Sequence, residues 1–159
     1  MNKKIKPKLL FLCLLIPLLV GALSAFLSRD GMEAFSSVPK PALTPPPIVF
    51  VVVWTLIYLS MGFASYLVVT SKEPQIKIDA SLRVYATQLA FNFFWSIFFF
   101  GLSAYLFSFI WLVGLWISII ANIVSFYRLS KAAGVILIPY LLWVSFAGYL
   151  NLSVYLLNL

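Results

Sequence analysis

Residues 84–127 read VYATQLAFNFFWSIFFFGLSAYLFSFIWLVGLWISIIANIVSFY and contain no Asp, Glu, Lys or Arg. The hydrocarbon core of a bilayer is about 30 Å thick, and about 20 helical residues cross it. This run is therefore about twice as long as one membrane-spanning helix needs to be. Near its middle, Gly101-Leu102-Ser103 is suited to a tight turn. The stretch predicts two successive membrane-spanning helices, near 82–100 and 104–127.

The rest of the chain holds three further charge-free runs, at 9–28, 41–71 and 132–159. Each is long enough to supply one membrane-spanning helix. The three helices are expected near 9–27, 47–69 and 133–157. The sequence thus predicts an all-α integral membrane protein, in which one domain over residues 1–159 forms a bundle of five transmembrane helices.

Composition excludes the soluble classes of protein. Of the 159 residues, 64% are hydrophobic and 9% are charged, whereas soluble domains carry about 25% charged residues. So few charges cannot cover a water-facing surface, and neither a soluble enzyme nor a nucleic-acid partner is expected. The single cysteine, Cys13, and the absence of histidine leave no internal disulfide and no imidazole ligand. No metal site is expected.

The few charges also limit the mechanism. No ionisable side chain lies at the centre of a predicted span. Charges inside the membrane mark ion paths and proton relays. Their absence argues against an ion pump or a proton-coupled transporter.

Basic residues predict the orientation of the bundle. Nine of the eleven lie on the side of the N-terminus, and only Arg29 and Lys40 lie on the other. Cytoplasmic segments carry the excess of Lys and Arg, so the N-terminus is expected in the cytoplasm and the C-terminus outside. The nine residues are Lys3, Lys4, Lys6, Lys8, Lys72, Lys77, Arg83, Arg128 and Lys131.

The first helix allows one alternative interpretation. A basic start, an apolar run and the small residues around Ala22 and Ala25 are typical of a secretory signal peptide. The apolar run is long for such a peptide, and cleavage would leave four helices. We expect the first helix to be retained.

The one sizeable polar break, the outside loop at 28–46, is rich in proline. Proline fixes φ and removes a hydrogen-bond donor, so a stiff, extended entry into the second helix is expected. Such a loop is either a lid over a cavity or a plain connector. The prolines at its end are Pro39, Pro41, Pro45, Pro46 and Pro47.

Polar and aromatic side chains recur at helical spacing on three of the predicted helices. An unpaired amide near mid-membrane is costly, so Asn92 is expected to face another helix or a cavity. Trp and Tyr also serve as anchors at membrane interfaces, and a shared aromatic pocket is the alternative for Trp54 and Trp143. The stripes are Gln88, Asn92, Trp95 and Phe99; Trp54, Tyr58 and Ser65; and Pro139, Trp143, Ala147 and Asn151.

Three blocks of sequence resemble the signatures of the TspO/MBR family, the tryptophan-rich sensory proteins and translocator proteins. The first block holds KPALTPP at 40–46, VWTLIY at 53–58 and MG at 61–62. The second is QLAFNFFWS at 88–96. The third holds PYLLW at 139–143, FA at 146–147 and LN at 150–151. The blocks follow the order of the family, and the resemblance covers nearly the whole chain.

The resemblance implies a five-helix bundle, commonly a homodimer, in a bacterial cell membrane. It also implies a cavity that opens toward the loop at 28–46 and binds porphyrins such as protoporphyrin IX, or other hydrophobic small molecules. Porphyrin would be a ligand or substrate, and no separate cofactor is expected. The implied ligand-binding residues are Pro45, Pro46, Trp54, Tyr58, Asn92, Trp95, Trp143 and Ala147.

The sequence departs from the family pattern in the loop and at the C-terminus. Leu43 stands where many members have tryptophan, and Ala34-Phe35 replaces a Trp-Tyr pair of many bacterial members. No basic residue follows Tyr155, so the sterol motif of animal members is incomplete. Arg29 or Lys40 would either meet a porphyrin propionate or act as a solubilising charge.

Three functions are consistent with these residues. The first is a receptor or transporter that binds porphyrin. The second is an enzyme that promotes light-dependent oxidative breakdown of porphyrin, with Trp54 and Trp143 as the catalytic residues. The third is a structural membrane subunit without a ligand.

Overall fold

In this computed structural model, residues 5–159 are described, and they fold into helices and connecting turns without a strand. Five helical segments of this part of the chain are long and apolar enough to cross a membrane. The predictions of an all-α fold and of five spans are thus confirmed. The spanning elements are α1 (Pro7–Leu27), α3 (Pro47–Val69), α4 (Gln75–Ser96) with the π-helical turn η2 (Ile97–Gly101), α5 (Tyr105–Leu129), and α6 (Lys131–Ile136) with α7 (Ile138–Leu157).

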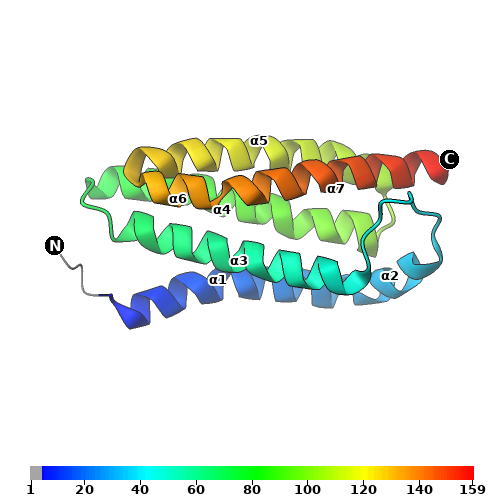
Figure 1. Cartoon of the computed structure of the whole chain (residues 1–159), viewed down its shortest axis with the longest axis horizontal. Coiled ribbons are helices and arrows are strands. Elements are labelled where there is room, and N and C mark those ends of the chain that lie inside the picture. Colours follow the sequence, from blue (N-terminus) through cyan, green and yellow to red (C-terminus); the bar gives the residue numbers. More distant parts are fainter. Residues whose placement is uncertain (1–4) are drawn as a thin grey trace.

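Successive spans run antiparallel along one long axis (Figure 1). α1 packs against α3 and α4, and α5 packs against α4, α6 and α7. The short helix α2 (Arg29–Ala34), the 3-10 turn η1 (Phe35–Ser37) and the C-terminus lie at one end of the bundle, which we call the loop end. The opposite end, where α1 and α4 begin, is called the basic end. Lys3 and Lys4 lie outside the described residues.

Helix α4 begins at Gln75, directly after Pro74, rather than near residue 82 as expected. Its first turns carry Lys77, Asp79 and Arg83, all exposed. The prediction was wrong because it took loss of hydropathy as the end of the helix. A helix satisfies its own backbone hydrogen bonds and can continue beyond the apolar layer.

The long charge-free run divides where expected, between η2 and α5. Before the break the chain forms the wider, π-helical turn η2. Its i to i+5 hydrogen bond is donated by the Leu102 amide to the Ile97 carbonyl oxygen at 2.9 Å. The residue with a left-handed backbone is Ser103 (φ 49°), not Gly101. The turn therefore uses a strained serine, and the freedom of the glycine backbone is not needed.

The last span is interrupted at Leu137, between α6 and α7. Pro139 lies in the first turn of α7, where its missing N–H costs no helical hydrogen bond. Helix α6 starts at Lys131, with the Ser130 hydroxyl accepting from the Ala133 amide at 3.4 Å. A kinked pair replaces the single helix that was expected near 133–157.

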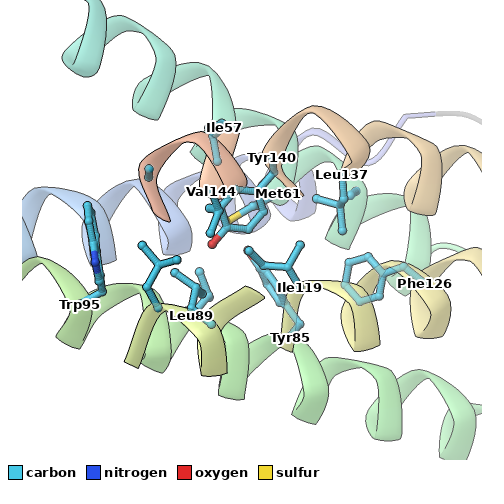
Figure 2. Packing of buried hydrophobic residues seen from close by; sticks show 14 of the residues in the cluster. Ile57, Met61, Tyr85, Leu89, Trp95, Ile119, Phe126, Leu137, Tyr140 and Val144 are labelled. Atoms are coloured by element: carbon cyan, nitrogen blue, oxygen red, sulfur yellow. The ribbon is translucent and has the colours of Figure 1, made fainter. Parts of the chain in front are cut away.

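The core lies between α3, α4, α5, α6 and α7, and large side chains fill it (Figure 2). Met61, Ile119, Phe126 and Tyr140 are 0–1% exposed. Away from this core, Leu, Ile, Val and Phe side chains are exposed over the outer faces of the helices. That distribution is typical of a bundle whose outer surface contacts lipid.

Helices α1 and α3 are in close backbone contact at Gly62. A Cβ atom at this position would lie 2.6 Å from the Cys13 carbonyl oxygen and 2.7 Å from the Leu14 Cα atom. Small residues allow this kind of backbone contact between membrane helices. Nothing can enter between the two helices at this level.

Candidate functional site

A second face of α3, turned toward α4 and α7, is packed by aromatic side chains. The α3 backbone comes close to α6 at the basic end, but it is held apart from α7 toward the loop end. Phe50, Trp54 and Tyr58 follow one another at one-turn spacing on α3, and all three are half-buried. The Phe50 and Trp54 rings fill the space between the separated backbones of α3 and α7, whereas the Tyr58 ring also packs against Gly21 of α1.

Trp54 is the centre of an aromatic cluster that joins α3, α4 and α7. Its ring stacks on Trp95 at 6.0 Å between centroids and 30° between planes. Tyr58 lies at 5.8 Å and Tyr140 at 6.2 Å from the Trp54 ring. Trp95 in turn stacks on Phe99 at 5.5 Å. We call these five residues the aromatic cluster.

Hydrogen bonds beside the cluster tie the same three helices together. The Tyr58 hydroxyl donates to Asn92 Oδ1 at 2.7 Å, and Asn92 Nδ2 donates to the Tyr140 hydroxyl at 2.8 Å. Gln88 Nε2 also donates to the Tyr140 hydroxyl, at 2.6 Å. Asn92 is 2% exposed. It faces other helices, as its position near mid-membrane requires.

A second network fixes the orientation of Trp95. Trp95 Nε1 donates to Asn151 Oδ1 at 3.1 Å, and the Ser108 hydroxyl donates to the same oxygen at 3.1 Å. Asn151 Nδ2 donates to the Tyr105 carbonyl oxygen at 2.8 Å. Because every polar atom of Asn151 is bonded within the protein, the Trp95 ring is held in a defined plane.

Trp143 lies one helical turn nearer the loop end than Tyr140. Its ring packs at 5.5 Å from Phe50 and at 5.6 Å from Phe146. The indole Nε1 is buried and has no hydrogen-bond partner among residues 5–159. A buried donor without a partner is costly, and here it is oriented by two flanking rings.

The implied site residues are not all brought together. Trp54, Tyr58, Asn92 and Trp95 form one contact network, whereas Trp143 contacts Phe50, which lies one turn before Trp54 on α3. Ala147 is 3% exposed, one turn further along α7. Pro45 is half-buried and Pro46 exposed, at the start of α3 and about two turns before Trp54.

The stripe drawn through Pro139 was wrong at that residue, which is exposed. Spacing of four residues exceeds the 3.6 residues of a helical turn. Positions four apart therefore shift around the helix, so that Ala147 and Asn151 are buried while Pro139, at the other end of the stripe, is exposed. Tyr140 occupies the inward position instead and is 1% exposed.

Sequence reasoning also missed three contributors. Tyr140 lies three and seven residues before Trp143 and Ala147, which is the spacing of one helical face. Phe50 lies one turn before Trp54. Asn151 was placed on the α7 stripe but not in the site, because nothing in the sequence pairs it with Trp95.

The loop packs over the end of the bundle. The Phe35 ring contacts Phe99 at 5.2 Å and Phe100 at 5.3 Å. Asn158 Nδ2 at the end of α7 donates to the Pro39 carbonyl oxygen at 3.1 Å. The first part of the loop is thus helical, and contacts at Phe35 and Pro39 hold the loop on η2 and on the end of α7.

The two basic residues of the loop have local partners. Lys40 Nζ donates to the Ser36 and Val38 carbonyl oxygens at 2.8 and 3.0 Å and lies 4.8 Å from the Phe35 ring centroid. Arg29 pairs with Asp30 at 3.3 Å. Lys40 therefore holds the loop in shape near the aromatic cluster, while Arg29 remains at the surface.

Comparison with known proteins agrees with this architecture. The model of the TspO/MBR family matches residues 13–157. The chain belongs to the TspO/MBR family. It is 37% identical over 159 residues to the tryptophan-rich protein TspO of Chlorobaculum tepidum, with 99% of each chain covered.

More distant TspO/MBR proteins align over most of their length as well. Protein CrtK of Rhodobacter capsulatus is 34% identical over 139 residues, with 87% of this chain and 85% of that protein covered. The human translocator protein is 32% identical over 133 residues, with 83% and 79% covered. This chain is a multi-pass membrane protein of the sensory and translocator family.

Proposed function

We propose that this TspO/MBR protein binds porphyrins such as protoporphyrin IX, and related hydrophobic molecules, between α3, α4 and α7. The observation that carries the proposal is the buried indole N–H of Trp143, which has no hydrogen-bond partner among the described residues. It lies beside Phe50, one turn from the aromatic cluster. A ligand acceptor group would satisfy this donor.

The chemistry of the site suits a flat, apolar ring. Ligand sites are mostly apolar, with a few placed polar groups that set orientation. The faces of Trp54 and Trp95 provide stacking surfaces, and Tyr58 and Asn92 provide hydroxyl and amide groups. Aromatic rings that now contact one another would contact the macrocycle instead.

The test is a titration of protoporphyrin IX into the detergent-purified protein, followed by quenching of tryptophan fluorescence. We expect saturable quenching and about tenfold weaker binding for Trp143→Phe, the effect of one lost hydrogen bond. The matched control is Trp116→Phe, because Trp116 is exposed on α5 and its Nε1 donates to Ser145. Absence of saturable quenching, or an equal loss in both variants, contradicts the proposal.

A second candidate is light-dependent oxidative breakdown of bound porphyrin. Trp54 favours it, because its ring contacts Trp95, Tyr58 and Tyr140 and could pass an electron to a photoexcited ligand. With oxygen, light and saturating protoporphyrin IX, Trp54→Phe and Trp143→Phe should abolish product while binding persists. Equal breakdown of free porphyrin under the same light contradicts an enzymatic role.

We also propose a homodimer. Support comes from Ala86 and Ala90, which are exposed one turn apart on α4 and line an apolar groove with Leu19 and Leu23 of α1. Small residues at this spacing permit close contact between helices. Ala90→Trp should convert a dimer to a monomer in light scattering of the detergent-solubilised protein, and an unchanged mass contradicts this interface.

For the placement in the cell, we propose a bacterial cell membrane with the basic end in the cytoplasm. The excess of Lys and Arg at that end supports the orientation. A reporter active only outside the cytoplasm, fused to the C-terminus, should be active. An inactive reporter with normal expression contradicts it.

A further inference from the structure

The two ends of the bundle differ in charge. The loop end carries two basic and two acidic residues, so its net charge is zero. Arg29 pairs with Asp30 there, and Lys40 donates to two carbonyl oxygens. The described part of the basic end carries seven basic and two acidic residues, which leaves it a net charge of +5. The seven are Lys6, Lys8, Lys72, Lys77, Arg83, Arg128 and Lys131.

The two acids of the basic end do not neutralise this excess. Glu73 pairs with Lys77 at 3.1 Å. Asp79 lies one turn before Arg83 but accepts from Gln75 Nε2 at 2.8 Å, and it forms no ion pair within residues 5–159. The six remaining basic side chains are all exposed, and none has an ion-pair partner in the described part of the chain. Their charge must be balanced from outside the protein.

Arg83 lies nearer the middle of the bundle than the basic residue of the neighbouring helix α5. The Ser81 and Ser125 hydroxyls are 2.7 Å apart, so these positions of the antiparallel helices α4 and α5 lie at one level. From that level, Arg83 lies two residues toward the loop end and Arg128 three residues toward the basic end. At 1.5 Å per residue, Arg83 is about 8 Å deeper than Arg128.

This depth places Arg83 at the edge of the apolar layer of the membrane. The helical segment from Arg83 to Gly101 is about 27 Å long, and the hydrocarbon core of a bilayer is about 30 Å thick. The charge-free run 84–127 begins directly after Arg83. An arginine at this edge extends its guanidinium toward the headgroups. Such a position favours a lipid phosphate over an anion dissolved in water.

We infer that the basic end binds the headgroups of net-anionic phospholipids, with Arg83 as the residue that contacts the lipid phosphate. The planar guanidinium matches two phosphate oxygens. Each basic residue near an anionic membrane surface strengthens binding about fivefold. The net charge of +5 selects anionic over zwitterionic lipid, whereas the loop end, with a net charge of zero, has no such preference. The inference does not rest on porphyrin binding.

The test measures lipid binding to the delipidated full-length protein in detergent by native mass spectrometry. The probes are phosphatidylglycerol and phosphatidylcholine with the same acyl chains. We expect tighter binding of phosphatidylglycerol, and an about fivefold smaller preference in Arg83→Gln. Arg29→Gln is the matched control and should keep the preference, because Arg29 is exposed at the loop end and pairs with Asp30. Equal binding of the two lipids, or an equal loss in both variants, overturns the inference.

Thermal unfolding tests whether the headgroup charge is responsible. Phosphatidylglycerol should raise the Tm of the parent protein above the value in phosphatidylcholine. In about 1 M NaCl, where charges are screened beyond about 3 Å, this difference should disappear. A difference that persists at that salt concentration overturns the inference. Inorganic phosphate should not displace bound phosphatidylglycerol, and displacement would assign the basic end to soluble anions instead of lipid.

Discussion

The two sides of α3 show how one helix can be closed on one face and adaptable on the other. Against α1, Gly62 allows the backbones to touch, with a Cβ position only 2.6 Å from the Cys13 carbonyl oxygen. Against α7, Phe50 and Trp54 fill the gap by ring contacts at 5.5 and 6.2 Å. The first contact is made by backbone, the second by side chains.

This difference bears on where the proposed ligand would enter. Backbone atoms in helices cannot move apart without breaking the pair, whereas aromatic side chains can change rotamer and exchange one ring contact for another. A polar link runs from Tyr58 of α3 to Asn92 of α4 and from Asn92 to the Tyr140 hydroxyl of α7. The α3–α7 side is therefore the adaptable one.

The largest effect is expected when the closed side is forced open. Gly62→Leu places a branched side chain against the Cys13 and Leu14 backbone, where nothing can give. We expect a loss of about 3 kcal/mol or more in stability, seen as a low yield of folded protein and a lower Tm. Gly101→Ala is the control, since its Cβ would have Ile97 Cγ2 at 3.8 Å as its nearest neighbour. If Gly62→Leu and Gly101→Ala gave the same yield and Tm, the α1 side of α3 would not be closed.

A smaller effect is expected at the polar centre of the adaptable side. Asn92→Leu leaves the Tyr58 hydroxyl without its acceptor and the Tyr140 hydroxyl with only one of its two amide donors, Gln88. The expected loss of stability is about 2 kcal/mol, measured by thermal unfolding in detergent. Thr87→Val serves as control, because the exposed Thr87 hydroxyl bonds only to the Arg83 carbonyl oxygen of its own helix. A fully stable Asn92→Leu protein would show that the network does not hold α3, α4 and α7 together.

A smaller loss of stability is expected when the Tyr58 hydroxyl alone is removed from this network. Tyr58→Phe keeps the ring contact with Trp54 but deletes the hydrogen bond to Asn92 Oδ1. A loss of about 1 kcal/mol is expected, with retained quenching by porphyrin and a modestly raised Kd. Tyr127→Phe, at an exposed tyrosine of α5, should match the parent protein. If Tyr58→Phe lost as much stability as Asn92→Leu, the Tyr58–Asn92 hydrogen bond would account for the whole stabilisation by the network.

The smallest effect on stability is expected at the loop. Phe35→Ala removes the ring contacts with Phe99 and Phe100 and leaves the bundle intact. We expect a loss of under about 1 kcal/mol, with faster binding and release of protoporphyrin IX in stopped-flow quenching. Met32→Ala, at an exposed side chain of α2, is the control. Unchanged rates for Phe35→Ala would make the loop a connector rather than a lid.

Local sequence predicted which way some residues of the candidate site face, and it failed for others. Trp54, Tyr58, Asn92 and Trp95 lie on faces that helical spacing identifies, and the structure brings them together. Pro139 and Tyr140 exchange roles, because a spacing of four drifts around a helix and α7 starts after a break at Leu137. The start of α4 at Gln75 was missed, because hydropathy reports the lipid layer and not the end of the helix.

The sequence by itself determined the five spans, their antiparallel order and the kinds of side chain available inside them, since length, hydropathy and helical period act within each segment. The tertiary structure alone decided which side of α3 is closed, which hydroxyl Asn92 and Gln88 reach, and which buried groups stay unpaired. These outcomes depend on the distance and rotation between helices far apart in the chain. Only packing sets those two quantities.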